Sequence, residues 1–364
     1  MSTHHSIKIP AHYNIYNGDT GRELRIDFCV PDNGVDESTG LVVFVPGFGG
    51  HIDSNVYKKM RNTFPDQFNL VTIQCDYFGS RFMQNANRMT IKNQRLLHEH
   101  FAPNEVALIN NDWPGFLQLL SDRNIVFPVF AVMDESMTEF NDMGFMQAID
   151  IITAVEAVKI ILSENQLRFN TNRVIGYGHS HGAYLLHLSN VLAPHLFSFL
   201  IDNSAWLEPQ YLSTNRFLYA QVGQSTLAVE FEYLARKLIK NKRALNLRSL
   251  YNGNVPNKTQ ILTFQGNDDH LVNHVDKMRF MESIDHSNFI LVTEHDIENK
   301  KFRSNKHGLD ADFLELFSSS MDFERKGIKD LVSEHRPRYS IDSQGVNIEV
   351  DYTHNLPLFH VHFK

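Results

Sequence analysis

The run Val174-Ile175-Gly176-Tyr177-Gly178-His179-Ser180-His181-Gly182-Ala183-Tyr184-Leu185 decides how this chain folds. An apolar segment ends in Gly-His-Ser-His-Gly and passes directly into a helical pattern, which predicts a strand, a sharp turn and a helix. A serine at the tip of such a turn can meet both a base and a substrate carbonyl carbon. The sequence therefore predicts that Ser180 is an activated nucleophile.

Glycines lie two residues before and two residues after this serine. The turn strains the serine backbone, and side chains at these positions would collide with the adjoining strand and helix, which Gly178 and Gly182 avoid. Chance supplies Gly-x-Ser-x-Gly in about one chain in ten of this length. The alternative is a glycine-rich turn with no catalytic role. The inference that Ser180 is a nucleophile therefore depends on the strand before the motif, the helix after it and suitable partner residues downstream.

The composition excludes several classes of function. The chain has 364 residues and a formal net charge of -8, from 34 Lys and Arg against 42 Asp and Glu. This balance gives no basic surface for nucleic acid or an anionic membrane, and we expect neither as a partner. No stretch has the length and apolar character of a signal peptide or a membrane span. The oligomeric state is left open.

The two cysteines, Cys29 and Cys75, lie in strand-like runs. We expect buried thiols rather than a disulfide, which suits a reducing compartment. Together with the absence of a targeting segment, this predicts a cytoplasmic protein.

Strand and helix patterns alternate along most of the chain. A hairpin is expected over 13–30 around Asn17-Gly18-Asp19, further strands at 41–45, 70–77, 174–178, 197–201, 260–265 and 288–294, and helices at 55–68, 145–162, 273–283 and 310–323. The helix at 145–162 reads as amphipathic. This alternation predicts a single α/β domain over residues 1–364, with a mostly parallel sheet covered on both faces. Ligands in such sheets bind at the carboxyl ends of the strands.

Three segments interrupt the alternation. Residues 78–140 read as an insertion with short helical patterns, and residues 206–255 read as a candidate lid with helical character over 228–245. Residues 338–364 show strand-like alternation. The lid aromatics indicate a partly apolar pocket, and packing under the lid explains them equally well; they are Trp206, Tyr211, Phe217 and Tyr219.

A serine nucleophile needs a carboxylate that fixes the tautomer of its histidine base. The loop after the strand at 260–265 reads Gly266-Asn267-Asp268-Asp269-His270 and offers two adjacent carboxylates at a carboxyl end. We choose Asp269 and keep Asp268 as the alternative. In isolation, both aspartates read equally well as solvated turn or capping residues.

The histidine base should follow the last core strand if the chain order is Ser, Asp, His. His307 lies in Lys306-His307-Gly308, in a loop long enough to fold back over the sheet edge. His295 directly ends the strand and is the alternative. We choose His307 because Gly308 leaves its ring accessible.

Backbone N–H groups must hold the oxyanion. One donor should be His181, immediately after the nucleophile, and the second Phe48 or Gly49 in Pro46-Gly47-Phe48-Gly49-Gly50. This loop lacks the Gly-Lys-Ser/Thr ending of a phosphate loop. The side chains of His179 and His181 should point away from the serine hydroxyl.

A metal site is the remaining catalytic alternative. The pairs His98/His100 and His360/His362 share a face if extended, but neither comes with a third ligand or a His-Glu-x-x-His helix. We therefore expect no catalytic metal and no cofactor.

Four motifs together resemble the α/β-hydrolase superfamily; they are residues 178–182, 46–50, 266–272 and 306–308. The resemblance covers residues 24–323 and implies an eight-stranded, mostly parallel sheet. It places Ser180 after the fifth strand, Asp269 after the seventh and His307 after the eighth. The Gly-x-x-Asp-x-x-Val spacing of the superfamily falls on Gly266, Asp269 and Val272, which supports Asp269.

Two finer resemblances concern narrower groups. Residues 141–150 are similar to the helix that precedes the nucleophile strand in esterases and prolyl-oligopeptidase-like peptidases. Residues 46–50, 141–150 and 200–204 resemble an uncharacterised bacterial family of the superfamily, loosely associated with motility and flagellin-glycosylation loci. That family has no assigned reaction, and the insertion at 78–140 departs from common esterases.

The sequence predicts a serine hydrolase that cleaves an ester, and less readily an amide, through an acyl-enzyme on Ser180. A carboxylesterase-like activity on a small-molecule ester or an acylated sugar fits best. Two alternatives stay open. The same residues could transfer the acyl group to a sugar hydroxyl or an amine, and a non-catalytic member would use the fold only for binding.

Overall fold

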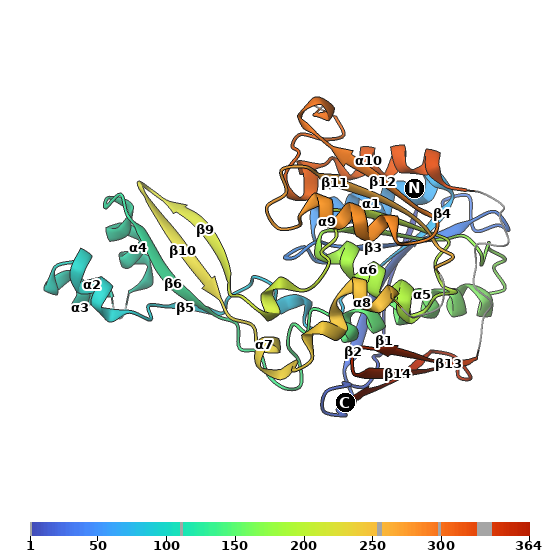
Figure 1. Ribbon diagram of the computed structural model, residues 1–364, viewed down its shortest axis with the longest axis horizontal. Helices are drawn as coiled ribbons and strands as arrows, with labels where there is room; N and C mark the ends of the chain where they lie inside the picture. Colours follow the sequence, from blue (N-terminus) through green and yellow to red (C-terminus); the bar gives the residue numbers. More distant parts are fainter. Residues whose placement is uncertain (1, 110–111, 253–256, 298–299, 326–336) are drawn as a thin grey trace.

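An eight-stranded sheet runs through the computed structural model, which describes residues 2–109, 112–252, 257–297, 300–325 and 337–364. Its strand order is β1-β2-β4-β3-β7-β8-β11-β12 (Figure 1). The strands are β1 (Thr3–Pro10), β2 (Glu23–Val30), β3 (Gly40–Val45), β4 (Leu70–Cys75), β7 (Val174–His179), β8 (Phe199–Asn203), β11 (Gln260–Gly266) and β12 (Ser287–Val292).

The sheet is parallel from β4 to β12, while β1 and β2 pair antiparallel at one edge. β3, β4, β7, β8 and β11 are buried along their whole length, as expected of strands covered on both faces. The prediction of a mostly parallel, eight-stranded α/β sheet is confirmed.

Helices cover both faces of the sheet (Figure 1). They are α1 (Asn55–Phe68) and α10 (Phe313–Ser320) on one face, and α5 (Phe145–Glu164), α6 (His181–Leu192) and α9 (His274–Glu282) on the other. On the first face Phe64 of α1 stacks on Phe317 of α10 with ring centroids 4.5 Å apart. The expected helices at 55–68, 145–162 and 273–283 are confirmed to within two residues at each end, whereas α10 starts three residues later than expected.

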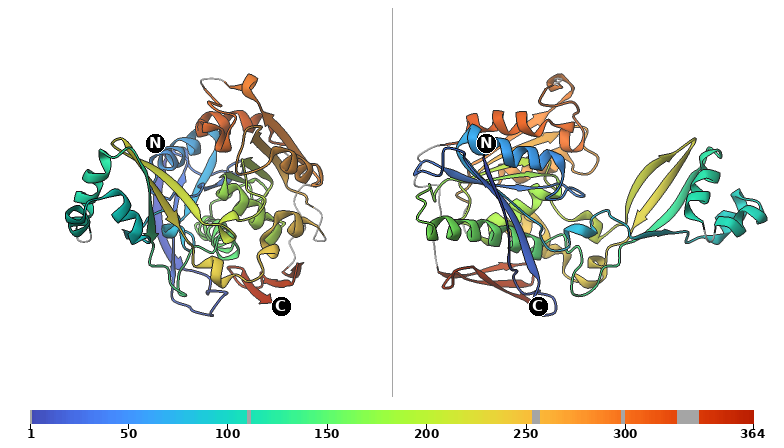
Figure 2. Two further views of the ribbon diagram at one scale, coloured as in Figure 1. Left: turned by 60° about the vertical axis from the view of Figure 1, so that its left-hand side comes forward. Right: turned by 180° about the vertical axis from the view of Figure 1, so that it is seen from behind.

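Two expectations for this core are wrong. The edge hairpin is expected over 13–30, but its first strand is β1, which pairs with β2. The side chains of β1 are mostly exposed, so its polar sequence lacks a clear strand pattern. The helix α5 is buried nearly all round rather than amphipathic. The reason is a second, three-stranded sheet of β13 (Arg338–Ser343), β14 (Val346–Asp351) and β15 (Leu358–Phe363), which lies beside α5 in Figure 1 and in the right-hand view of Figure 2. The strand pattern expected at 338–364 is thereby confirmed.

A third sheet forms an arm that extends away from the main sheet (Figure 2). Its order is β5-β6-β10-β9, with β5 (Arg88–Thr90) and β6 (Val126–Val132) from one part of the chain and β9 (Arg216–Val222) and β10 (Ser225–Phe231) from another. It carries α2 (Gln94–His100), α3 (Pro103–Ile109) and α4 (Trp113–Ser121). The segments expected as an insertion and as a lid therefore share one sheet, through parallel pairing of β6 with β10.

The helical character expected over 228–245 is wrong for its first part, because residues 225–231 form β10 between β6 and β9. Pairing on both sides overrides the local helix propensity. Short helices follow at α7 (Ala235–Leu238), η3 (Lys242–Leu245) and α8 (Leu247–Tyr251). The remaining short helices are η1 (Ser80–Phe82), η2 (Gln210–Leu212), η4 (Glu294–Asp296), η5 (His307–Asp310) and η6 (Met321–Phe323).

Cys29 and Cys75 are both buried and free, as predicted. No helix in the described residues has the length and apolar character to cross a bilayer.

A buried ionic cluster joins α6, β8 and α9. Lys277 Nζ lies 2.7 Å from Asp202 Oδ2, and His187 Nε2 lies 3.0 Å from the same oxygen. All three side chains are buried. Burial alone would raise the pKa of the Asp202 carboxyl, but Lys277 and His187 outweigh it, so this pKa falls below its ordinary value. The cluster thus links α6, the helix after Ser180, to β8 and to α9.

The variant Lys277→Met should lose about 3–5 kcal/mol of unfolding free energy, because it leaves the Asp202 carboxylate buried without its cation. Urea denaturation at neutral pH measures this. The double variant Lys277→Met/Asp202→Asn should recover part of the loss, since no buried charge is then uncompensated. A single variant as stable as wild type would contradict this view of the cluster.

Candidate active site

Ser180 lies between β7 and α6, at the carboxyl edge of the main sheet. Its backbone has φ 52° and ψ -118°, a conformation that L residues rarely adopt. Its N–H donates to the carbonyl oxygen of Asn203 at the end of β8, at 2.7 Å. The neighbouring strand thus holds a strained residue in place, as the expected sharp turn requires.

The two flanking glycines sit where no side chain fits. A Cβ on Gly178 would lie 2.6 Å from the backbone of Ala183, and a Cβ on Gly182 would lie 2.1 Å from the carbonyl oxygen of Val45. The first contact is with the helix and the second with β3. The collisions expected from the sequence are therefore present in the structure.

A continuous chain of hydrogen bonds links three of the predicted site residues. His307 Nε2 lies 2.6 Å from Ser180 Oγ, and His307 Nδ1 lies 2.8 Å from Asp269 Oδ2. Because a carboxylate can only accept, Nδ1 carries the ring proton and Nε2 is left to accept from the serine hydroxyl. Burial raises the pKa of the Asp269 carboxyl, but hydrogen bonds, the largest from His307, outweigh it and hold this pKa below its ordinary value.

The alternatives considered from the sequence lie elsewhere. Asp268 has a side chain that is 47% exposed, and its ionic partner is His270 at 3.8 Å. His295 is exposed within η4, a short turn capped by Thr293. The structure brings Asp269 and His307 to Ser180, and not Asp268 or His295.

Two residues that the sequence reasoning did not single out hold the histidine loop. Ser204 Oγ accepts from the N–H of Gly308 at 3.2 Å, and Asn203 Nδ2 donates to the carbonyl of Gly308 at 3.2 Å. A Cβ on Gly266 would lie 2.0 Å from the carbonyl oxygen of Asn305, so the loop also packs directly on β11. The sequence signal that could have identified Asn203 and Ser204 is their position as polar residues at the carboxyl end of a core strand.

The backbone donors expected for an oxyanion lie on either side of Ser180. The N–H of His181 opens α6, so it has no partner within the helix. Among the described residues, no acceptor bonds to the N–H of Phe48, whereas the N–H of the alternative, Gly49, donates to Met83 Sδ at 3.1 Å. The geometry therefore favours Phe48 over Gly49 as the second donor.

The histidines that flank the serine are buried and uncharged. Burial lowers the pKa of both His179 and His181 to about 3, and Arg216 contributes to the shift at His181. The ring of His179 stacks on Phe313 at 3.6 Å, and that of His181 packs 4.9 Å from Trp206. Neither ring is hydrogen-bonded to Ser180, in keeping with the expectation that both point away.

A cavity of about 390 Å³ opens over Ser180 and His307. Its wall is mostly apolar and includes Gly47, Phe48, Tyr57, Trp206, Tyr211, Arg216, Leu271 and Phe313. Of the aromatics expected to line the pocket, Trp206 and Tyr211 do so. Phe217 and Tyr219 instead lie on β9 with 47% and 70% exposure, because they follow the point where the chain leaves the main body for the arm.

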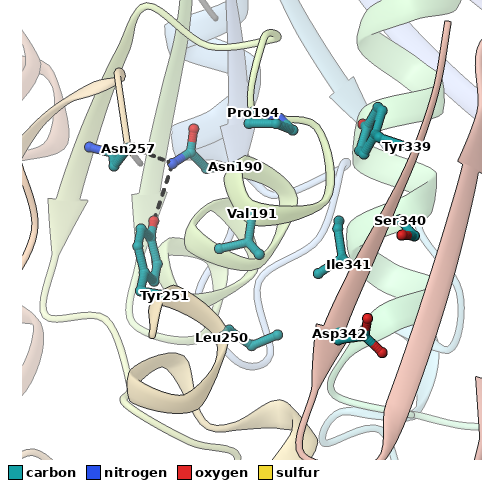
Figure 3. Close-up of a pocket in the computed structure, with 10 residues that line it drawn as sticks. All are labelled: Asn190, Val191, Pro194, Leu250, Tyr251, Asn257, Tyr339, Ser340, Ile341 and Asp342. Carbon is teal, nitrogen blue, oxygen red and sulfur yellow. Dashed lines mark hydrogen bonds between the residues drawn. The ribbon is translucent and has the colours of Figure 1, made fainter. Parts of the chain in front are cut away.

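A second cavity, of about 200 Å³, lies between α6, α8 and β13 (Figure 3). Figure 3 shows the Asn190 amide facing Tyr251 and Asn257, to which it donates at 3.2 and 2.9 Å. The residues that line it include neither Ser180 nor His307. In the residues that the structure describes, no group of three or more His, Cys, Asp or Glu could hold a metal ion.

Comparison with known proteins gives a match to one family model. Residues 120–215 match a family model described as a protein of unknown function, DUF2920. No curated protein matches the sequence.

Solved structures share the fold at low sequence identity. A proposed dipeptidyl aminopeptidase IV from Bacteroides ovatus is 14% identical, over 90% of this chain and 36% of its own, with a TM-score of 0.50. Est1E from Butyrivibrio proteoclasticus, solved with ferulic acid, is 12% identical over 83% and 94% of the two chains, with a TM-score of 0.46. An acylaminoacyl peptidase from Pyrococcus horikoshii is 13% identical over 90% and 43%, with a TM-score of 0.47. The chain has the α/β-hydrolase fold.

The variant Gly182→Ala tests the crowding at the turn. The sign of the change in unfolding free energy is the result that decides. Helix propensity alone predicts a gain of about 1 kcal/mol for alanine in a helix. The contact with Val45 predicts a loss of about 1–3 kcal/mol, because the backbone of β3 would have to move. Urea denaturation separates the two signs.

The matched control is Gly115→Ala, in the first turn of α4. There the added Cβ would meet a side chain instead of backbone, the carboxylate of Asp112, which caps α4 by accepting from the Gly115 N–H. We expect a loss of about 1 kcal/mol at most, from the weakened cap. A stabilised Gly182→Ala variant would show that the contact with β3 is not a constraint.

Proposed function

We propose that this protein is a serine hydrolase that cleaves small-molecule esters through an acyl-enzyme on Ser180. The hydrogen-bond chain from Asp269 through His307 to Ser180 carries this proposal. A hydroxyl 2.6 Å from an imidazole nitrogen, whose other nitrogen is held by a buried carboxylate, can pass its proton to that ring as it attacks.

In the first half-reaction, Ser180 Oγ attacks the ester carbonyl carbon while His307 Nε2 accepts the hydroxyl proton. The backbone N–H groups of Phe48 and His181 are the proposed donors to the oxyanion that forms. The intermediate collapses as the ester C–O bond breaks, and His307 returns the proton to the leaving alkoxide. An alcohol departs, and the acyl group stays on Ser180.

In the second half-reaction, a water molecule takes the place of the alcohol. His307 Nε2 accepts a proton from the water as its oxygen attacks the acyl carbon. The bond to Ser180 Oγ then breaks, and His307 returns the proton to the serine. Throughout, Asp269 stabilises the imidazolium that forms and fixes the ring orientation without becoming protonated.

The cavity supports a small substrate. Its volume of about 390 Å³ falls at the lower end of the range for small-molecule sites, about 300–1,000 Å³. We propose residues 206–216 as the part of the predicted lid that shapes substrate access, because Trp206, Tyr211 and Arg216 line the cavity beside Ser180. An acyl ester or an acylated sugar of modest size fits such a site.

A fluorophosphonate probe tests the nucleophile. Wild-type protein should become covalently labelled and lose its activity on p-nitrophenyl esters, whereas Ser180→Ala should neither label nor turn over. Intact-protein mass spectrometry and peptide mapping measure the labelling. An unlabelled wild-type protein, or labelling that persists in Ser180→Ala, would overturn the enzyme assignment.

Matched histidine variants test the base. His307→Ala should lower kcat by a factor of about 10³ or more, because the serine loses its proton acceptor. The exposed His295 provides the control, and His295→Ala should keep wild-type kcat. Steady-state assays with p-nitrophenyl acetate measure both, and the opposite pattern would reassign the base to His295.

Matched aspartate variants test the orienting carboxylate in the same assay. Asp269→Asn should lower kcat by a factor of about 10³–10⁴, because an amide can favour the wrong tautomer of His307. Asp268→Asn removes a neighbouring carboxylate with an exposed side chain and should change kcat by less than about twofold. Equal effects at the two positions would argue against a specific bond from Asp269 to His307.

A further inference from the structure

We propose that Arg216 forms an anion-binding subsite beside Ser180, and that the natural substrate carries a carboxylate. The inference deepens the proposed ester hydrolysis and depends on it. Arg216 is the first residue of β9 and lines the cavity that also contains Ser180 and His307. None of the residues that line this cavity is Asp or Glu.

Aromatic rings hold the guanidinium in place. Its central carbon lies 4.7 Å from the centroid of the Phe48 ring and 5.7 Å from that of Tyr211. Both rings line the same cavity, and Phe48 also supplies a proposed oxyanion donor. Cation–π contacts with both rings favour this position of the charge, and the forked N–H groups of a guanidinium match a planar acceptor.

The described part of the chain provides no ion-pair partner for Arg216. Arg216 Nη1 donates a long hydrogen bond, of 3.4 Å, to the carbonyl oxygen of Met83. It also interacts with the Tyr233 hydroxyl, which itself donates to that carbonyl at 2.6 Å. A half-buried guanidinium thus keeps most of its donors for another acceptor.

Nearby carboxylates are engaged elsewhere. Glu230, on β10, accepts from Asn215 Nδ2 and lies 3.9 Å from Lys92. Glu135 accepts from the N–H groups of Asn141 and Leu234 at 2.9 and 2.7 Å. The positive charge at the cavity is therefore not neutralised by the acidic residues around it.

A second donor, the indole N–H of Trp206, belongs to a residue that lines the same cavity. The side chain of Trp206 lines the cavity and is 2% exposed, and its indole N–H has no acceptor among the described residues. Its ring lies 5.5 Å from Phe48 and 5.4 Å from Tyr211, the same two rings that hold Arg216. Buried donors without acceptors are rare in native proteins. The unpaired indole N–H and the free N–H groups of Arg216, around one pair of rings, together favour an acceptor on the ligand.

The chemistry favours a carboxylate over a phosphate. A single guanidinium matches one negative charge, and its forked N–H groups match the two oxygens of a carboxylate. A phosphate carries close to two charges and is usually held by several cations or by backbone N–H groups. The rest of the wall is apolar and aromatic, which suits the body of an organic ester acid.

Two pairs of esters test the subsite from both sides of the scissile bond. The first pair is mono-p-nitrophenyl glutarate and its methyl ester, and the second is 4-acetoxybenzoate and its methyl ester. The measured quantity is the ratio of kcat/KM for the charged ester to that for the neutral ester. We expect a ratio above one in at least one pair, and a fall of about 10- to 100-fold in Arg216→Met.

Two further variants make the result specific. Arg216→Lys keeps the charge but not the fork, and its ratio should lie between those of wild type and Arg216→Met. Arg95→Gln removes an exposed cation from α2 on the arm and should leave the ratio unchanged. An equal fall in Arg95→Gln would show a general effect of net charge and would overturn the subsite.

The outcomes separate this inference from the proposed function. Turnover of neutral esters with the same ratio in wild type and Arg216→Met would overturn the subsite and leave the hydrolase intact. If no ester is turned over, calorimetric titration of glutarate into wild type and Arg216→Met decides. Binding that the variant loses would support the subsite, and equal or absent binding would overturn it.

Discussion

The rest of the site depends on one backbone constraint, the positive φ of Ser180 between β7 and α6. This conformation places the hydroxyl at the edge of the sheet, but it brings the chain on both sides into contact with backbone. Only glycine fits at 178 and 182, where an added carbon would meet α6 and β3. The hydrogen bond from Ser180 N–H to Asn203 ties the strained residue to the next strand.

The same sheet edge collects the other groups. β8 ends at Asn203, and both Asn203 and the next residue, Ser204, bond to Gly308; β11 ends beside the loop that carries Asp269. Because parallel strands present their carboxyl ends at one edge, residues far apart in the chain converge there. The buried ion pair of Lys277 and Asp202 joins α9 to β8, one residue before Asn203.

The base of the arm supplies residues to the cavity that the core does not provide. The two parts of the arm are separated along the chain by α5, β7, α6 and β8 of the main fold, yet β6 and β10 pair in parallel and make one sheet (Figures 1 and 2). At its base, the chain that leads into β9 brings Tyr211 and Arg216 over the Phe48 ring. The core thus supplies the proposed chemistry, and the base of the arm supplies aromatic and charged contacts that bear on the choice of substrate.

The sequence by itself determined the central sheet, because continuous apolar runs such as 41–45 and the glycine spacing at 178–182 are local signals of buried strands and a tight turn. It also indicated Asp269 and His307 through loops that end core strands. Only tertiary structure decided that residues 225–231 form a strand, that α5 is buried all round, and that Arg216 faces the cavity. Each of these depends on partners distant in sequence, namely β6, the sheet of β13–β15 and the Phe48 ring, which no local pattern specifies.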